Sequence, residues 1–100
     1  MQVKFRTKKL RKQYESKKAA TKAYGPEVAK KYVQRIGIIK QTASLEELQA
    51  QHPLRCHALK GDRQGEWAIN LTGFMRLIFT FKDEELTIVC IEEVSKHYDD

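Results

Sequence analysis

The spacing of the apolar residues changes along this chain, and that change limits the possible folds more than any other feature. Up to about residue 50, apolar side chains recur at intervals of three and four, as on the buried stripe of a helix. After Pro53 they alternate with polar side chains, as in strands with one buried face. Helices followed by a run of strands predict an α+β domain, with helices covering one face of a mostly antiparallel sheet.

The helical part of the sequence predicts an N-terminal strand and a helical hairpin. Apolar and basic residues alternate over residues 3–6, which indicates a short, half-buried strand. A helix is expected from Thr7 to about Ala23. Gly25 interrupts it, and Pro26 suits the first turn of a second helix, which should pack antiparallel to the first. The second helix carries a continuous apolar stripe: Val28, Tyr32, Val33, Ile36 and Ile39.

The remaining residues predict a short helix and four strands. Ser44 and Glu47 have the spacing of a capping box, so a helix should begin there and run to about Ala50. Four strands are expected at residues 55–59, 67–71, 75–81 and 86–94, separated by turns rich in glycine and charged residues. A chain of 100 residues is the usual size of one domain, so we expect a single domain over residues 1–100.

Composition excludes several classes of protein. There is no run of 18 apolar residues and no apolar N-terminal segment of the secretory type, so we expect a cytoplasmic protein without a membrane partner. Cys56 and Cys90 fit neither a CxxC redox pair nor a metal-ligand spacing. We interpret them as buried, reduced thiols.

The net charge of +6 is unevenly distributed. Residues 1–40 contain thirteen Lys or Arg and two acidic residues, whereas residues 41–100 contain six and eleven. Such an asymmetry favours a basic face formed by the N-terminal segment and suited to a polyanion such as RNA or the ribosome. An ordinary solvated helical surface is the alternative.

The residues able to do chemistry lie in the second half of the chain. His57, Lys60, Arg63 and Arg76 fall on or beside the strands, and His97-Tyr98 follows the last of them. If the strands are hairpin neighbours, these groups can converge on one face. A cation within an apolar strand needs a reason, and for Arg76 the structural alternative to a functional role is a salt bridge with a neighbouring strand, for instance to Glu66 or Glu93.

No metal-ligand cluster, glycine-rich phosphate loop or nucleophilic triad accompanies these residues. They leave acid–base chemistry with cationic stabilisation, and RNA suits that set because its own 2′-hydroxyl is the nucleophile. Histidine can serve as acid or base near neutral pH, while arginine and lysine can stabilise charge on the phosphate. No metal or other cofactor is then required.

One stretch of this half, RCHALKGDRQGEWAINLTGFMRLIF, resembles the HigB-type toxins of the RelE/ParE superfamily. The pattern of that family is approximately R-x-H-x-L-K-G-D-R-x-G-x-(W/F)-(S/A)-(I/L), followed by (Y/W)-R-L-(I/C)-F. AYGPEVAKKYVQR and SLEEL upstream also fit. The resemblance implies a RelE-like fold and a metal-independent mRNA endoribonuclease that cuts the codon in the ribosomal A site. It further implies a HigA-like helix-turn-helix antitoxin, whose complex with the toxin binds operator DNA.

The resemblance assigns catalytic roles to His57, Lys60 and Arg76 in this sequence. Many relatives end in Asp-Tyr-His, whereas here Lys96 stands where the acid is expected and the aromatic residue follows the histidine. His97 could therefore take the terminal histidine's role, or Tyr98 could stack on a base. The residues expected to bind RNA or the ribosome are Lys8, Lys9, Arg11, Lys12, Arg55 and Arg63.

Two other functions remain open from the sequence. A ParE-like toxin would inhibit DNA gyrase by binding and would not need His57, Lys60 and Arg76 together. A non-enzymatic basic module that binds RNA or the ribosome would be consistent with the altered C-terminus.

Overall fold

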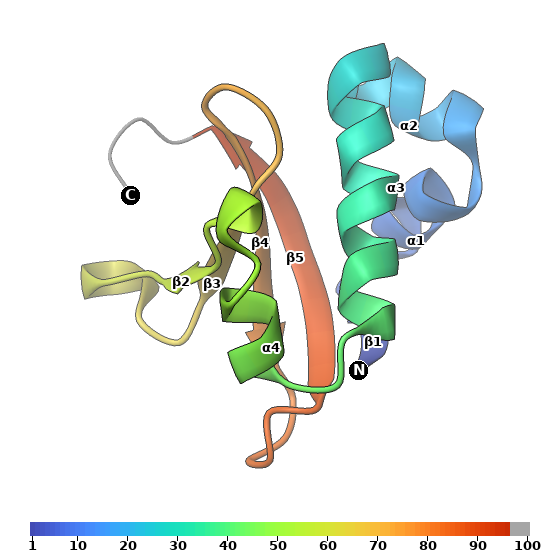
Figure 1. Ribbon diagram of the computed structural model, residues 1–100. Coiled ribbons are helices and arrows are strands. Elements are labelled where there is room, and N and C mark those ends of the chain that lie inside the picture. The colour runs from blue at the N-terminus through green and yellow to red at the C-terminus, as the bar shows by residue number, and fades with distance from the viewer. Residues whose placement is uncertain (97–100) are drawn as a thin grey trace.

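A five-stranded sheet with helices on one face forms the centre of the computed structural model, which describes residues 1–96 (Figure 1). The α+β class is therefore confirmed. In chain order the elements are β1 (Gln2–Phe5), α1 (Lys8–Glu15), α2 (Lys17–Tyr24), α3 (Pro26–Gln41), α4 (Leu45–Gln49), β2 (His57–Ala58), β3 (Trp67–Asn70), β4 (Met75–Phe81) and β5 (Ile88–Lys96). Short 3-10 turns occur at His52–Leu54 and Gly61–Arg63.

The strand order is β1-β5-β4-β3-β2, and all neighbouring strands are antiparallel except β1 and β5. Successive strands from β2 to β5 are joined by turns, which permits antiparallel pairing. The connection from β1 to its neighbour β5 runs through the helices and the other three strands, and so long a connection permits a parallel pair. The expectation of a mostly antiparallel sheet is confirmed.

The first helical segment contains two helices, so the prediction of one continuous helix over residues 7–23 was wrong. Ser16 separates α1 from α2 in extended backbone. Its hydroxyl accepts a hydrogen bond from the Ala19 amide at 3.2 Å, while its own amide donates to the Lys12 carbonyl at 2.9 Å. Serine is a favoured N-cap, so this one residue ends α1 and starts α2. The predicted start is confirmed, since the Thr7 hydroxyl caps α1.

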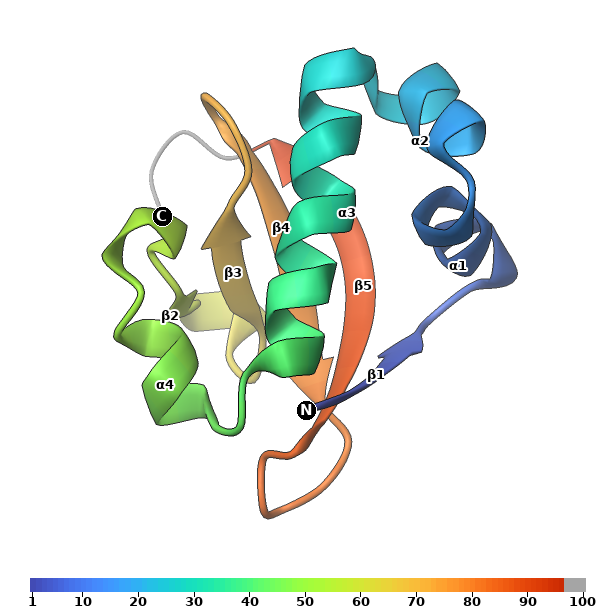
Figure 2. The ribbon, with the colours of Figure 1, turned by 45° about the vertical axis from the view of Figure 1, so that its right-hand side comes forward.

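The α2–α3 hairpin and the apolar stripe of α3 agree with the sequence. Gly25 joins the two helices at a positive φ of 84°, a conformation that glycine adopts without steric cost, and Pro26 begins α3. Tyr32, Ile36 and Ile39 are completely buried between α3 and the sheet. Figure 2 shows α3 lying across the sheet. The Tyr32 hydroxyl donates to the Leu10 carbonyl at 2.7 Å, and burial raises the pKa of this phenol.

The Ser44 cap expected for α4 is present, with the Ser44 hydroxyl accepting from the Glu47 amide at 3.2 Å. Strand β2 is shorter than the expected 55–59. Arg55 has a positive φ of 49° after one 3-10 turn, and a second such turn begins at Gly61, so that only His57–Ala58 pair with β3 as a strand.

The last strand begins two residues later than expected. The Asp83 carboxylate accepts hydrogen bonds from the amides of Thr87 and Ile88, which closes the β4–β5 turn. Leu86 lies inside this turn with a positive φ of 58° and cannot start the strand. The hydrogen bond from Thr87 lowers the pKa of Asp83.

The two faces of the sheet differ in what they bury. Leu77 and Phe79 of β4 point into the main core beneath α3. Ile78, between them, points to the opposite face and forms a small second cluster with Leu59 and Ala68. We call this opposite surface the far face. It is the face on which most of the candidate site is found.

Both cysteines are free and buried, as expected from the sequence. Burial raises the pKa of the Cys56 thiol to about 12, so this thiol stays protonated at neutral pH. Among residues 1–96, no helix has the length and apolar character needed to span a membrane.

Candidate functional site

Strand pairing brings polar and charged residues together on the far face. His57 on β2 pairs with Ala68 on β3, Ala68 pairs with Ile78 on β4, and Ile78 pairs with Glu93 on β5. In the next row of the same face, Arg76 lies between Asn70 and Ser95. The sheet thus sets His57 and Arg76 two strands and two residues apart. Standard strand geometry places the two Cα atoms roughly 12 Å apart. Histidine and arginine side chains that extend toward each other cover most of that distance.

Arg76 is the most buried of the predicted site residues, with only 7% of its surface exposed. Its Nη1 donates hydrogen bonds to the carbonyls of Gly73 at 2.9 Å and Met75 at 3.1 Å. Gly73 lies in the β3–β4 turn and Met75 is the first residue of β4, so the backbone at the start of β4 holds the guanidinium at one end of the far face. The prediction that Arg76 points away from Leu77 and Phe79 is confirmed.

Arg63 makes the ion pairs that the sequence offered as an alternative for Arg76. Its guanidinium donates to Glu66 Oε1 at 2.7 Å and to Glu93 Oε2 at 3.0 Å. The hydrogen bond to Glu66 raises the pKa of Arg63. This cluster ties the β2–β3 connection to β5, and the carboxylates compensate the charge of Arg63. The predicted contact of Arg63 with RNA stays a prediction.

The backbone before β2 orients His57. The positive φ of Arg55 turns its carbonyl back toward the ring, and His57 Nδ1 lies 2.7 Å from that oxygen. A carbonyl can only accept a hydrogen bond, so Nδ1 carries the proton. In a neutral ring Nε2 is then the basic nitrogen. The Arg55 side chain itself is exposed.

Lys60 lies at the start of the 3-10 turn Gly61–Arg63, three residues after His57, and is exposed. Its ammonium makes no ion pair with any residue in the described range 1–96. The Leu59 amide donates to the Glu66 carbonyl at 2.9 Å, which fixes the backbone next to Lys60. The other two predicted catalytic residues, His97 and Tyr98, lie outside the described residues.

Sequence reasoning missed three residues near Arg76. Asn70 and Glu93 were not expected to take part in the site, yet both lie on the far face. Phe74 lies in the β3–β4 turn with 52% of its surface exposed. The sequence did contain a signal for Asn70. It lies two residues after Ala68, so both side chains point to the same face, and no other residue of β3 is polar apart from the Trp67 indole nitrogen. For Phe74 the signal was an aromatic residue in a glycine turn.

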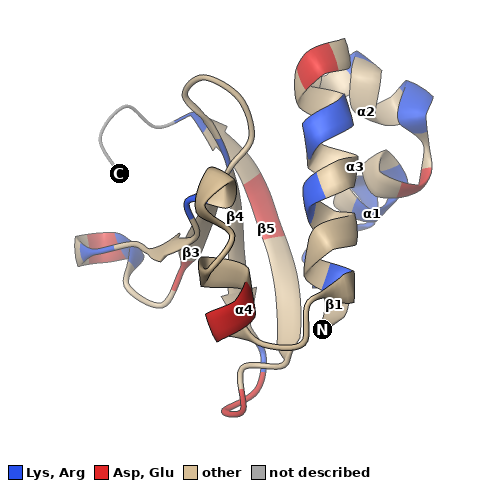
Figure 3. Ribbon diagram, in the orientation of Figure 1, with Lys and Arg blue, Asp and Glu red and all other residues tan. Residues whose placement is uncertain are grey.

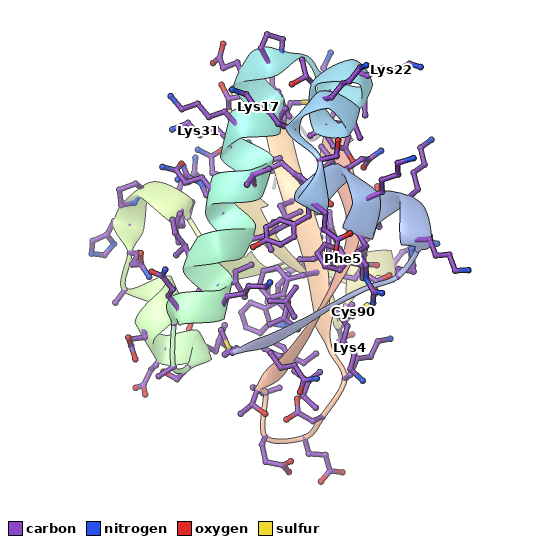
Figure 4. The ribbon with its side chains drawn as sticks, turned by 90° about the vertical axis from the view of Figure 1, so that its right-hand side faces the viewer. Lys4, Phe5, Lys17, Lys22, Lys31 and Cys90 are labelled. Atoms are coloured by element: carbon purple, nitrogen blue, oxygen red, sulfur yellow. The ribbon has the colours of Figure 1, made fainter. Side chains whose placement is uncertain are left out.

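The predicted ribosome-binding residues of α1 lie elsewhere. Lys8, Lys9, Arg11 and Lys12 are exposed on the helical layer, by which we mean α1, α2 and α3. Basic residues mark all three helices of this layer, while acidic residues mark α4, the β4–β5 turn and β5 (Figure 3). Figure 4 shows Lys17, Lys22 and Lys31 on the same layer. This basic surface and the far face are on opposite sides of the sheet.

In the part of the chain that the structure describes, no group of three or more His, Cys, Asp or Glu residues could hold a metal ion. The candidate residues on or beside the far face are His57, Lys60 and Arg76, together with Asn70 and Glu93.

Comparison with known proteins gives a family and a fold. A family model described as a RelE-like toxin of the type II toxin–antitoxin system HigB matches residues 3–93. The structure is similar to a YoeB/ParE toxin from Agrobacterium tumefaciens, with a TM-score of 0.64 and 18% identity, covering 98% of this chain and 100% of that one. It is also similar to the toxin chain in a YoeB–YefM complex from Staphylococcus aureus, with a TM-score of 0.61, 16% identity and 98% of each chain covered. None of the curated proteins matches the sequence significantly.

Proposed function

The chain belongs to the HigB-like family of RelE-like toxins from type II toxin–antitoxin systems, and on that premise we propose that it is a ribosome-dependent, metal-independent mRNA endoribonuclease. The observation that carries the proposal is the placement of Arg76 on the far face, held by the carbonyls of Gly73 and Met75 and one row from His57. A toxin that only blocked gyrase would have no need for this combination of cation and base.

The proposed reaction uses the RNA's own 2′-hydroxyl. His57 Nε2 takes the proton of that hydroxyl, and the 2′-oxygen attacks the adjacent phosphorus. The bond from phosphorus to the 5′-oxygen of the next nucleotide breaks, and an acid protonates the departing oxygen. The products are a 2′,3′-cyclic phosphate on the upstream fragment and a 5′-hydroxyl on the downstream fragment.

Cations stabilise the charge that builds up on the phosphate oxygens. Arg76 supplies a planar guanidinium that can contact two phosphate oxygens, and Lys60 supplies a point charge from the β2–β3 connection. We assign the acid to His97 and a base-stacking role to Tyr98, as the resemblance to the family suggests.

The basic helical layer supports dependence on the ribosome. Lys8, Lys9, Arg11 and Lys12 are exposed on α1 of the helical layer, so they can hold ribosomal RNA while the far face receives mRNA. Arg55 is exposed beside His57 and is assigned to the mRNA strand, and Arg63 to the same strand as a secondary contact.

An antitoxin partner is part of the same proposal. The YoeB–YefM complex is a solved relative in which a toxin of this fold is bound to another protein. For this chain we propose a HigA-like antitoxin with a helix-turn-helix domain, forming in the cytoplasm a complex that binds operator DNA.

Purified protein incubated with ribosomes that hold a defined codon in the A site tests the proposal. We expect primer extension to map a cut within that codon, and the same mRNA without ribosomes to stay intact. Equal cutting of free mRNA would overturn ribosome dependence. No cutting at all, together with inhibition of purified gyrase, would favour the ParE-like alternative.

A further inference from the structure

Asn70 contains a buried acceptor without a partner. Its side-chain Oδ1 is inaccessible to solvent, and no hydrogen bond reaches it from the residues that the structure describes. The backbone carbonyl of the same residue, in contrast, accepts from Arg35 Nε at 3.1 Å, which anchors the end of β3 to α3. Buried polar groups are nearly always paired, because an unpaired one destabilises the protein that contains it. A partner is therefore expected from outside the described residues 1–96, and a bound ligand can supply it.

The position of Asn70 indicates where that partner comes from. The Leu71 amide donates to the Met75 carbonyl at 3.0 Å, so residues 71 and 75 form a hydrogen-bonded pair of the β3–β4 ladder. The adjoining pair, Asn70 and Arg76, is then of the non-hydrogen-bonded type. Side chains of such a pair lie closest together on their face of an antiparallel sheet. The unpaired acceptor thus lies directly beside the proposed phosphate-binding arginine.

The chemistry of RNA supplies a matching partner. A phosphate offers only acceptors, and these suit Arg76. The hydrogen-bond donors of a ribonucleotide are its 2′-hydroxyl and the amino or imino groups of its base. An acceptor next to a phosphate-binding cation can therefore engage a donor of the nucleotide attached to that phosphate.

We propose that Asn70 is a substrate-binding residue: rotation of its half-buried amide about χ2 brings Oδ1 to the surface of the far face, where it accepts a hydrogen bond from the mRNA nucleotide bound at Arg76. The inference rests on the proposed function and adds to it a direct contact to the bound nucleotide. The donor is either a ribose 2′-hydroxyl or a base amino group, and the substrates below separate these two sources.

Asn70→Leu removes the acceptor at nearly constant size. We expect kcat/KM for ribosome-dependent cleavage to fall about tenfold, the loss typical of one hydrogen bond of somewhat over 1 kcal/mol. We expect the melting temperature to stay the same or rise, because the substitution removes a buried group that is unpaired in the free protein. A purely structural role for Asn70 would give the opposite result, a lower melting temperature with unchanged kinetics.

Thr80→Val is the matched control. Thr80 lies on β4 on the same face as Arg76, but its hydroxyl already donates to Glu92 Oε2 at 2.9 Å. Removing a satisfied hydroxyl should lower the melting temperature and leave kcat/KM unchanged. Asn70→Leu should therefore slow cleavage without lowering the melting temperature, whereas Thr80→Val should lower the melting temperature without slowing cleavage.

Modified mRNAs identify the donor. One series carries single 2′-deoxy substitutions at the nucleotides flanking the scissile one, and the other carries bases that lack their amino group. The substitution that removes the donor should slow the wild-type protein about tenfold and should slow Asn70→Leu no further. If the wild-type protein is active and Asn70→Leu cleaves mRNA at the same rate, this inference alone is overturned. An inactive wild-type protein would overturn the proposed function and the inference with it.

Discussion

Arg76 is the residue on which the proposed chemistry depends most. It is an almost completely buried cation on a strand that is otherwise apolar up to Thr80, and the carbonyls of Gly73 and Met75 fix its guanidinium. Fixed donors aimed at developing charge account for a large part of the rate in many enzymes.

Two substitutions of Arg76 distinguish the effect of its positive charge from the effect of its two-point contact with phosphate. For Arg76→Ala we expect cleavage to fall about a hundredfold, the typical loss when one transition-state donor is removed. Arg76→Lys should recover part of that rate, because a lysine keeps the charge but loses the two-point contact. Single-turnover cleavage on programmed ribosomes measures both. Circular dichroism and melting temperature confirm that the variants are folded, and full activity in a folded Arg76→Ala variant would contradict the assigned role.

At the level of single residues, the sequence predicted the face of the sheet to which a side chain points better than the residue with which it pairs. Alternation along residues 75–81 was enough to place Arg76 opposite Leu77 and Phe79. The ion pair of Arg63 with Glu93 was not predictable, because Glu93 is thirty residues away and meets Arg63 only through the strand register. The same reason explains why Asn70 was missed: its significance comes from lying opposite Arg76.

Among the elements, helices were easier to predict than short strands. The stripe of α3 and the caps at Thr7 and Ser44 depend on neighbouring residues, and all three are found in the structure. Ser16 also has a local cap signal, but it lies within a stretch of good helix formers that masked it. The length of β2 depends on two flanking 3-10 turns, which alternation of apolar residues does not encode.

Helix α1 should determine how binding to the ribosome responds to salt. Each phosphate contact contributes about 0.7–0.9 to the slope of log affinity against log salt, because it releases counterions. Changing the four basic residues Lys8, Lys9, Arg11 and Lys12 to Gln should therefore weaken ribosome binding and reduce that slope, by up to about 3 if all four contact phosphates. Ribosome co-sedimentation at several salt concentrations measures the slope.

A control with the same change in net charge distinguishes α1 from overall charge. Lys4→Glu combined with Lys82→Glu also lowers the net charge by four, but these exposed residues lie on β1 and in the β4–β5 turn. The control should keep a slope close to that of the wild-type protein. An equal loss of slope in both variants would mean that α1 is an ordinary solvated surface.

The whole molecule has two chemically different sides. The helical layer concentrates the basic residues, and the far face on the other side of the sheet contains His57 and Arg76 (Figure 3). Similarity to solved structures at 16–18% identity establishes only the shared fold. The family assignment comes from the sequence match over residues 3–93. In the proposed function, the helical layer holds the ribosome while the far face acts on mRNA.

The chemical nature of the cut ends tests the central claim most directly. Mass spectrometry of mRNA fragments from programmed ribosomes should find a 2′,3′-cyclic phosphate, or the 3′-phosphate formed by its hydrolysis, on the upstream fragment. The downstream fragment should begin with a 5′-hydroxyl. These ends result from attack by the 2′-hydroxyl, assisted by His57 and Arg76. A 3′-hydroxyl upstream and a 5′-phosphate downstream would show that water is the nucleophile, and would contradict the mechanism.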